Sequence, residues 1–525
     1  TVMAFKNDDI PLDAVVIDIF WFGKDIKGHM GNLSWYKDSF PEPKTMINRL
    51  KKKDIHTVLV TEPYILSTSK RWYEANDLNI LAKDSLGHSA RFNFYFGNTG
   101  IIDIQNPKGK DWFWNLNKAL IHQGISGIWG DLGEPEVHPK WVQHTTGSAD
   151  AIHNSYGHDW AKLLFEGYEK DFSKKRPFIL MRAGAAGSQR YGLIPWSGDV
   201  NRTWGGLQSQ AEITLQMGMQ GLAYMHSDLG GFAGANLDDE LYMRWLQFGV
   251  FQPIYRPHAQ EDVAAEPVFR SDSVKSIVKE AIELRYQLLP YNYTLVYQNT
   301  ISGAPLVRPL FFEEPENRSL LTHKESYLWG ENLLIHPIVK PKVKEISMYF
   351  PKSYNWYNFY TDEKMNGGVN YTIPVKQNAI PTYVRGGAFI PMSYPIKTTS
   401  AYNKDSLLLH FYYDSSTTTS QDELYHDDGR TALTLENGDY ELLSFSSNHT
   451  NNEINIIFSC TLGKQYKFTK KQVDFVIHNV PETIEAVILN GEVITAYDVD
   501  LEKRLVQMSF PWSTKKEITI QLKLN

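Results

Sequence analysis

Two segments of the chain gather side chains that could do acid–base chemistry. The first, 127–136, reads GIWGDLGEPE and brings the carboxylates Asp131, Glu134 and Glu136 together directly after an apolar run. A buried carboxylate is costly unless it is paired or hydrogen-bonded, so three of them in one loop need a reason. A helix cap would use a single acid, and a metal site would need further ligands, while the chain carries no HExxH, EF-hand or P-loop motif.

The second segment, 181–199, reads MRAGAAGSQRYGLIPWSGD, with Arg182 near its start and Asp199 at its end. Two acids from different strands are what glycosidic cleavage requires. One ionised carboxylate attacks or stabilises the anomeric carbon, and one protonated carboxyl protonates the leaving oxygen. Different surroundings must then separate the pKa values of the two groups. From these residues alone, other barrel hydrolases, lyases and aldolases remain open as alternatives.

Tryptophans adjoin both acids. Trp129 lies two residues before Asp131, and Trp196 lies three before Asp199. Most tryptophans in proteins are core residues, but an indole beside a catalytic acid can offer its apolar face to the C–H groups of a sugar. Trp21 and Trp204 also adjoin acids at strand ends, and four such tryptophans together favour a carbohydrate site over a purely structural reading.

The elements that must position these residues are short apolar runs, each ending on a polar side chain. Seven such runs end at Asp18, Glu62, Asp131, Arg182, Asp199, Asp228 and His258. They are bounded by turn residues and separated by helix-like stretches, which predicts parallel strands of a β/α barrel whose site lies at the carboxyl ends of the strands. Because a closed barrel of this kind has eight strands, we expect the first strand to precede Thr1 and the Asp18 strand to lack a neighbour on one side.

Beyond residue 301 the pattern changes from helical periodicity to short alternating runs, such as 332–340, 346–351 and 407–414. Alternation of this kind predicts antiparallel β-structure. A chain of 525 residues exceeds what a single hydrophobic core normally supports, so two to four domains are expected.

Composition excludes several classes of partner. The net charge of −7 argues against nucleic acid and anionic membranes, which need a basic surface. No apolar stretch reaches the roughly 18 residues of a membrane span. The single cysteine, Cys460, excludes an internal disulfide and a thiolate metal cluster, but it leaves both reducing and oxidising compartments possible.

At the level of motifs the chain resembles glycoside hydrolase family 31. Segment 127–136 resembles the nucleophile motif of that family, and 182–199 resembles its acid/base segment. HSDLGGF at 226–232 and RWLQFGVFQPIYRPHA at 244–259 resemble its late-barrel signature, while PLVRPLFF, YVRGGAFIP and YHDDGRT resemble the domains that follow the barrel. The match runs in order over nearly the whole chain. DLGEPE and WFGKDIKGHMGNL are most similar to bacterial α-transglucosylases and α-glucosidases, including a dextran-active branch.

This resemblance implies a fold and a location. The expected fold is a (β/α)8 TIM barrel at 1–302, lacking its first strand, followed by a proximal β-sandwich at 303–392 and a distal one at 393–525. An upstream N-terminal β-sandwich segment is expected as a partner of the barrel. The resemblance also implies a periplasmic or extracellular location in a bacterium rather than a cytoplasmic one, with no signal visible in this chain.

The resemblance further implies a retaining α-glycosidase, an α-glucosidase or α-transglucosylase acting on α-1,4- or α-1,6-linked gluco-oligosaccharides, with no cofactor and no metal. Asp131 would be the nucleophile, Asp199 the general acid/base and Glu134 a support for the nucleophile loop. The residues implied to bind the sugar are Asp18, Phe20, Trp129, Arg182, Trp196, Asp228, Phe232 and His258.

Several alternatives stay open. Arg182 and Asp228 could form a structural ion pair, and His258 could be a histidine satisfied at the barrel rim. Phe20 follows Asp18 closely, and the α-xylosidases of the family also place an aromatic near there, against the sugar C6. α-Xylosidase or α-galactosidase activity therefore remains an alternative. A catalytically silent carbohydrate-binding relative should lack one of the two acids, and a metal-dependent lyase should lose activity on chelation.

Overall fold

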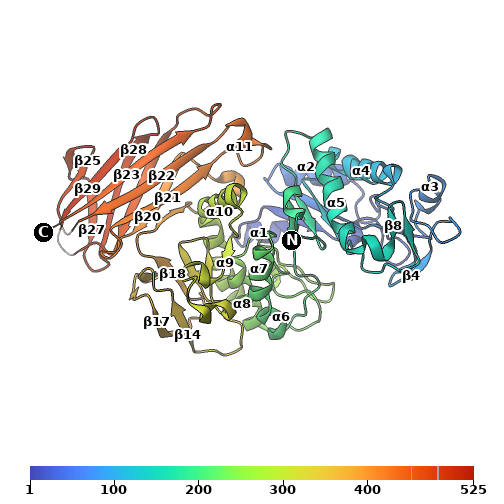
Figure 1. Cartoon of the computed structure of the whole chain (residues 1–525), viewed down its shortest axis with the longest axis horizontal. Coiled ribbons are helices and arrows are strands. Elements are labelled where there is room, and N and C mark those ends of the chain that lie inside the picture. The colour runs from blue at the N-terminus through green and yellow to red at the C-terminus, as the bar shows by residue number, and fades with distance from the viewer. Residues whose placement is uncertain (451, 482–483, 525) are drawn as a thin grey trace.

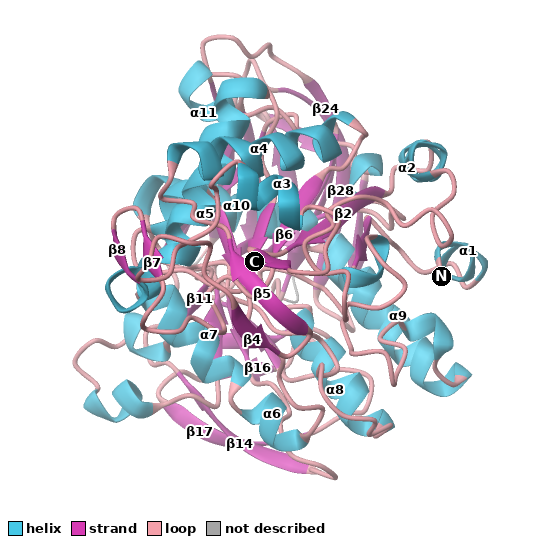
Figure 2. Ribbon diagram, turned by 90° about the vertical axis from the view of Figure 1, so that its right-hand side faces the viewer, coloured by secondary structure: helices cyan, strands magenta, loops and turns pink. Residues whose placement is uncertain are grey.

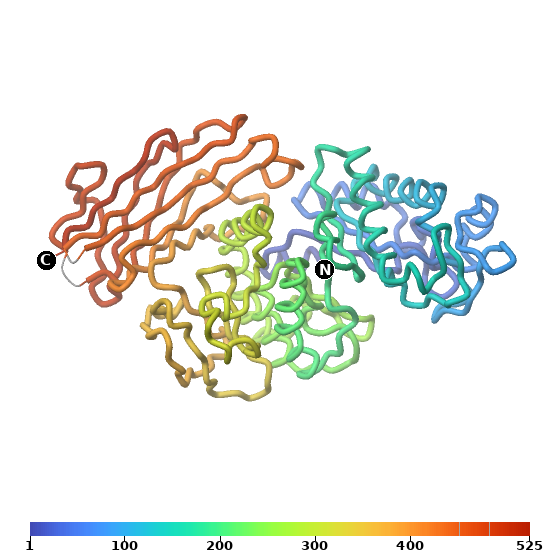
Figure 3. Tube along the Cα trace, viewed as in Figure 1, coloured from blue at the N-terminus to red at the C-terminus, as the bar shows by residue number. Residues whose placement is uncertain are grey.

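The computed structural model describes residues 1–525 except 451, 482–483 and 525. In Figure 1 the chain runs from a helix-rich part, blue to yellow-green, into a smaller β-rich part and ends in a long two-layered β unit, orange to red. The trace in Figure 3 places the N-terminus near the middle of the molecule and the C-terminus at the far tip of that β unit.

A parallel sheet forms the wall of the barrel. Its strands are hydrogen-bonded in the order β1 (Ala14–Ile17), β2 (His56–Thr61), β6 (Gly127–Gly130), β9 (Ile179–Met181) and β10 (Leu193–Pro195). Every neighbouring pair is parallel. The strands are short and mostly buried, as expected when helices cover one face of the sheet and side chains fill the other. Five of the seven apolar runs therefore form parallel strands, as predicted.

The two later runs are shorter than predicted. Among the described residues, parallel pairing continues past β10 only as isolated bridges, which join Trp196 to His226, Asn201 to Ala233 and Leu229 to Pro257. The run that ends at His258 contains Pro257, which has no N–H to donate to a neighbouring strand. The run that ends at Asp228 is followed by Gly230 and Gly231, whose φ angles are positive and not those of a strand. Neither run can therefore extend its strand pairing. The expectation of full strands ending at Asp228 and His258 is therefore wrong, although both side chains still lie at the end of a bridged segment.

Strand β1 lies at the end of the described sheet, and within the described residues no strand pairs with its free edge. This agrees with the prediction for the Asp18 strand. Figure 2 shows β2 and β6 inside the molecule with helices arranged around them.

Helices alternate with these strands and their start signals are visible in the sequence. Asn106 accepts a hydrogen bond from the amide of Lys108 and is followed by Pro107, and Asp238 caps the helix at 239–249 by accepting a hydrogen bond from the amide of Leu241. The helical segment over 272–302 is divided at Leu288, ahead of Pro290. The helices are α1 (Val2–Asn7), α2 (Pro43–Lys51), α3 (Trp72–Asp77), α4 (Pro107–His122), α5 (Ala149–Asp171), α6 (Trp204–Gln208), α7 (Gln210–Met219), α8 (Asp239–Gly249), α9 (Asp272–Gln287), α10 (Leu289–Ser302) and α11 (Thr434–Asn437). Of the described helices, none is both long and apolar enough to cross a membrane.

An excursion after β2 adds a small antiparallel sheet, in the order β3 (Tyr64–Leu66), β5 (Gly97–Ile101) and β4 (Phe92–Phe94). A two-residue hairpin, β7 (Gln143–His144) and β8 (Gly147–Ser148), follows the loop that carries Asp131. The apolar side chains of the small sheet pack into the barrel core, as do Val142 and Ala149 on either side of the hairpin.

The proximal β unit contains a six-stranded sheet and a hairpin. The sheet runs in the order β11 (Val307–Arg308), β12 (Tyr327–Trp329), β13 (Leu333–Ile335), β18 (Thr382–Arg385), β15 (Trp356–Asn358) and β16 (Lys364–Met365), and the hairpin is β14 (Glu345–Phe350) with β17 (Val369–Pro374).

The distal unit is a sandwich of two sheets around an aromatic-rich core. One sheet is β19 (Phe389–Met392), β20 (Ser406–Tyr412), β24 (Lys470–His478), β28 (Leu505–Ser513) and β27 (Tyr497–Asp500). The other is β21 (Thr419–His426), β22 (Glu441–His449), β23 (Glu453–Leu462), β29 (Ile518–Leu524), β25 (Ile484–Leu489) and β26 (Glu492–Ile494). All these pairs are antiparallel except β20 with β24. Strand β19 pairs with β20, so the change from one sheet system to the next falls between Arg385 and Phe389.

Candidate active site

The sequence-predicted acids gather because their strands are neighbours. Asp18 directly follows β1, Asp131 follows β6 and Arg182 follows β9, so all three start from the same edge of the sheet. Asp199 lies four residues beyond β10, the neighbour of β9. The amide of Asp131 also continues the ladder by donating to the carbonyl of Thr61 at 3.1 Å. The position of the nucleophile candidate is therefore fixed by the sheet itself.

Arg182 is the hub of the site. Its Nε lies 2.6 Å from Oε1 of Glu134 and 3.4 Å from Oδ1 of Asp131, and its Nη1 lies 3.4 Å from Oδ2 of Asp199. Its Nη2 forms a further ion pair with Glu136. The Arg182 side chain is only 9% exposed, and the planar guanidinium suits several carboxylates at once. One buried cation thus holds both predicted catalytic acids and the loop between them.

Asp228 pairs with Arg256, not with Arg182, so the structural ion pair considered from the sequence is not formed. The carboxylate of Asp228 is fully buried, and the guanidinium of Arg256 lies 5.5 Å from the ring centre of Trp196 and 6.0 Å from that of Trp129. The sequence reasoning missed Arg256. The available signal was its position two residues before His258, which in an extended segment places both side chains on one face.

The aromatic residues form a connected set beside the acids. The ring centres of Trp129 and Trp196 lie 5.8 Å apart, and Trp129 packs edge-on against His258 at 5.3 Å. His258 in turn contacts Phe232 at 5.1 Å, and its Nε2 lies 3.7 Å from Oδ2 of Asp18. The structure therefore brings these predicted binding residues together.

Phe20 is the predicted residue that the structure sets apart from this set. Phe20 lies in a short 3₁₀ helix, which Asp18 caps by accepting a hydrogen bond from the amide of Ile19. The Phe20 side chain is 43% exposed. None of the described aromatic contacts joins Phe20 to Trp129, Trp196 or His258.

Burial governs the electrostatics of the carboxylates. It raises the pKa of Asp131 to about 8, with Arg182 opposing the rise and Asp18 and Asp199 adding to it. Burial also raises the pKa of Asp199, again against Arg182, and raises that of Asp18 to about 6. Such a group titrates as a coupled set, and burial opposes the ionised form that a nucleophile at Asp131 would need. Positive charge developing next to Asp131 would favour its ionised form.

Glu62 is a second residue that the sequence reasoning left out of the site. It ends the β2 run, is fully buried, and neither carboxylate oxygen has a hydrogen-bond partner among the described residues. Burial, followed by the charges of Asp131 and Asp18, raises its pKa well above the usual value. The same strand-end pattern that identified Asp18 and Asp131 could have identified Glu62.

Several buried polar atoms around the acids also lack partners among the described residues: Trp129 Nε1, Trp196 Nε1, Asp228 Oδ2 and Arg256 Nη1. Unpaired buried donors and acceptors are expensive. A ligand rich in hydroxyl groups would satisfy both kinds of atom. In the described part of the chain, no group of three or more histidine, cysteine or acidic side chains has the arrangement of a metal site.

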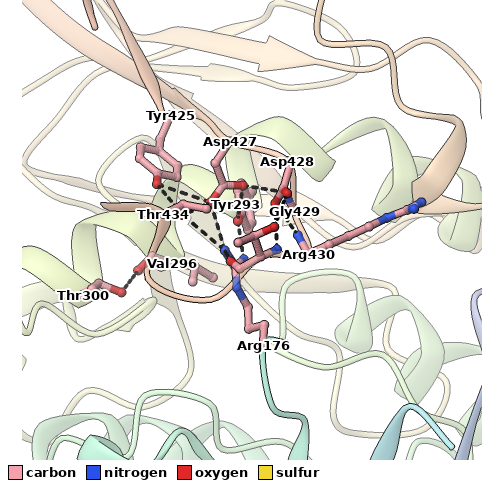
Figure 4. Close-up of polar contacts among 11 residues, drawn as sticks. Arg176, Tyr293, Val296, Thr300, Tyr425, Asp427, Asp428, Gly429, Arg430 and Thr434 are labelled. Atoms are coloured by element: carbon pink, nitrogen blue, oxygen red, sulfur yellow. Dashed lines mark hydrogen bonds and ion pairs between the residues drawn. The ribbon is translucent and has the colours of Figure 1, made fainter. Parts of the chain in front are cut away.

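Strand β9 positions Arg182, and the residues just before β9 bind to the distal sandwich. Lys175 bridges to Thr431, and the amide of Arg176 donates to the carbonyl of Arg430 at 3.2 Å. Nη2 of Arg176 donates to the buried carboxylate of Asp427 at 3.0 Å. Figure 4 shows this network, which Tyr293 of α10 and Thr434 complete by donating to Asp427 at 2.7 and 2.6 Å.

The fold and the site together define a TIM-barrel protein with a carboxylate and tryptophan site at the rim of the barrel. The family model described as the glycosyl hydrolases family 31 TIM-barrel domain matches residues 1–295, and that of the family 31 C-terminal domain matches residues 303–390. The chain belongs to glycosyl hydrolase family 31. This confirms the resemblance seen in the motifs and the expected order of barrel and β-sandwich domains.

Similar proteins include neutral alpha-glucosidase C of Homo sapiens, 31% identical over 443 residues, which cover 81% of this chain and 48% of that protein. Alpha-glucosidase 2 of Bacillus thermoamyloliquefaciens is 29% identical over 524 residues, 96% of this chain and 64% of that protein. A solved family 31 dextranase of Flavobacterium johnsoniae, complexed with glucose, superposes with a TM-score of 0.92 at 26% identity, covering 99% of this chain and 68% of that one. The chain thus spans about half to two thirds of the length of these curated relatives.

Proposed function

We propose that the protein is a retaining α-glycosidase acting on α-glucans. The observation that carries the proposal is the contact of Asp131 and Asp199 with one guanidinium, that of Arg182, beside Trp129 and Trp196. Retention requires two carboxyl groups only about 5–5.5 Å apart, and a shared cation is a means of keeping the largely buried Asp131 and the half-exposed Asp199 close. Relatives named as alpha-glucosidases and a dextranase support the choice of an α-glucoside.

In the first step, the ionised carboxylate of Asp131 attacks the anomeric carbon while the protonated Asp199 gives its proton to the leaving oxygen. The glycosidic bond breaks and a β-glycosyl ester forms on Asp131. In the second step, Asp199 removes a proton from water, or from a sugar hydroxyl, which attacks the same carbon and releases Asp131. The product keeps the α configuration.

The remaining residues would bind the sugar in the first subsite. Asp18, Asp228, His258 and Arg182 can exchange hydrogen bonds with its hydroxyls, and the predicted walls are Trp129, Trp196 and Phe232. Glu134 contributes by holding Arg182. Phe20 stays a proposed binding residue, although its exposed side chain lies apart from these aromatic walls.

The test is to follow maltotriose and isomaltotriose by proton NMR during the first turnovers. A retaining enzyme forms the α anomer first, and mutarotation produces the β anomer later. Initial formation of the β anomer would reject the mechanism, and cleavage of neither sugar would reject the substrate class. Glucose alone as product would mean hydrolysis, whereas longer oligosaccharides would mean transfer.

Two expectations from the resemblance stay proposals. One is an upstream β-sandwich that accompanies the barrel. The other is a periplasmic or extracellular location, which a polysaccharide substrate would suit. Both are open to experiment on the natural protein.

A further inference from the structure

A polar groove of about 620 Å³ lies between the two β units, in domains other than the one that carries Asp131. One wall is proximal, with Tyr354 and Arg385, and the other is the outer surface of β21, β22 and β23 in the distal sandwich. The volume falls in the range of small-ligand sites, about 300–1,000 Å³. It is therefore large enough to take a segment of an oligomeric ligand.

The distal wall, called the platform below, consists of neutral polar side chains together with the exposed Ile457. Two cross-strand rows run over it: Thr419 opposite Asn448 opposite Asn455, and Gln421 opposite Ser446 opposite Ile457. Residues that alternate with them, such as Phe445 and Ile456, are fully buried in the sandwich core. Period-two alternation therefore points the hydroxyls and amides of these rows outward, into the groove.

Arg385 brings unused hydrogen-bond donors to the opposite wall. Its Nε is buried without a partner, and within the described residues its guanidinium makes no side-chain hydrogen bond or ion pair. The guanidinium is held instead by stacking on Tyr354, with 4.7 Å to the ring centre. A buried N–H group without a partner, such as that at Nε of Arg385, is expensive to keep unless a ligand or water accepts from it.

The charges around Arg385 indicate which class of ligand the groove could bind. Asp422, Glu331 and Glu313 lie near enough to raise its pKa against the effect of burial. Two of these acids have other partners: Asp422 accepts from Asn332 and from the amide of Phe389, and Glu331 accepts from Arg308. An anionic ligand would meet these carboxylates, and an apolar one would leave the platform amides unpaired. A neutral ligand with many hydroxyl groups fits both walls.

We propose that this groove is an accessory binding site for a neutral polysaccharide chain, namely an α-glucan. The sugar class rests on the proposed function, whereas the groove itself does not. Platform amides and hydroxyls would exchange hydrogen bonds with the sugar hydroxyls, and the Arg385 guanidinium would donate to them. Holding a polymer at a second point raises its effective concentration at the barrel without changing the chemistry there.

The experiment is affinity electrophoresis of the full chain in gels containing dextran, soluble starch or a β-glucan. The variant is Gln421→Ala with Asn455→Ala, which removes two groove amides that make no side-chain hydrogen bond within the described residues. The matched control is Gln472→Ala with Gln507→Ala, two exposed amides on β24 and β28 of the opposite sheet. Arg385→Lys is a second groove variant that keeps the charge but loses the guanidinium fork. Thermal unfolding shows whether each variant is folded.

We expect dextran or starch to retard the wild type and the control equally, and retardation of both groove variants to weaken at least about fivefold. kcat/KM for a short aryl α-glucoside should be unchanged in the Gln421→Ala/Asn455→Ala variant, since the groove lies outside the barrel site. Equal retardation of folded groove variants and wild type, or no retardation by either α-glucan, would overturn the inference. Retardation by dextran or starch without any α-glucoside cleavage would refute the proposed function while the groove assignment stands.

Discussion

The guanidinium of Arg182 lies 3.4 Å from the carboxylate of Asp131, and the two residues end the neighbouring strands β9 and β6. The same side chain reaches Glu134, Glu136 and Asp199. A buried cation surrounded by four carboxylates makes their ionisation interdependent. This relationship leads to most of the predictions below.

Asp131→Ala should lower kcat for aryl α-glucosides by about 10⁴-fold or more, because the covalent intermediate can no longer form. Added azide should restore part of the turnover and give a β-glycosyl azide, since a small anion can occupy the space of the lost carboxylate. In the wild type, a 5-fluoroglycosyl fluoride should label Asp131 in peptide mass spectra. Label on Asp199 or Glu134 would contradict the assignment.

Asp199→Ala should impair substrates with poor leaving groups far more than glucosyl fluoride or activated aryl glucosides, which need little protonation. The measurement is a plot of log kcat/KM against leaving-group pKa for wild type and variant. A steeper slope in the variant is expected. A uniform loss across the series would assign Asp199 a structural role instead.

Arg182→Lys should shift the acid limb of the kcat/KM profile to higher pH. Arg182 opposes the burial that raises the pKa of Asp131, and a lysine cannot match its contacts with several carboxylates. Catalysis needs Asp131 ionised, so a higher pKa moves the rising limb upward. Lys162→Arg, on a surface ion pair of α5, is the control and should leave the profile in place. An unshifted profile in a folded Arg182→Lys variant would exclude this electrostatic role.

Asp131→Asn should raise the thermal stability at pH 8–9 by a few degrees, with the gain fading as the pH falls toward 4. The pKa of Asp131 is raised in the folded state, to about 8, so the folded protein binds the proton more tightly than the unfolded chain. The wild type therefore loses stability as the pH rises from about 4 to about 8, and a neutral side chain avoids that loss. Calorimetric scans across this pH range provide the measurement. A gain that grows as the pH falls would reverse the sign and contradict the argument.

Asp427→Asn should destabilise the protein by about 1–3 kcal/mol and lower kcat/KM several-fold, because the buried partner of Arg176 is lost just before β9. Asp428→Asn is the matched control, since within the described residues that neighbouring acid accepts hydrogen bonds only from Arg430 and Thr431 of its own loop. Denaturant unfolding and kinetics on a short substrate should separate the two variants. Equal behaviour of both would mean that the network in Figure 4 does not support β9.

Much of the fold could be predicted from the local pattern of apolar and polar residues. The runs that end at Asp18, Glu62, Asp131, Arg182 and Asp199 do end parallel strands or lie just beyond one, because a buried strand must be apolar until it reaches the rim. The same rule failed for the two later runs, which end at Asp228 and His258. Pro257 and the positive-φ glycines Gly230 and Gly231 reduce their pairing to single bridges, an effect of backbone chemistry that side-chain hydrophobicity does not report.

What the sequence by itself determined is the order of domains, the family and the identity of the two candidate acids, because these depend on residue types at fixed local spacing. Only the tertiary structure decided the partners. Arg182 meets Asp131 and Asp199, Asp228 meets Arg256, and Glu62 lies buried beside them, because strand neighbours in a barrel bring distant segments together. Burial, and with it the direction of each pKa shift, is likewise a property of the packed molecule: the cost of desolvating a carboxylate depends on everything around it and not on its neighbours in the chain.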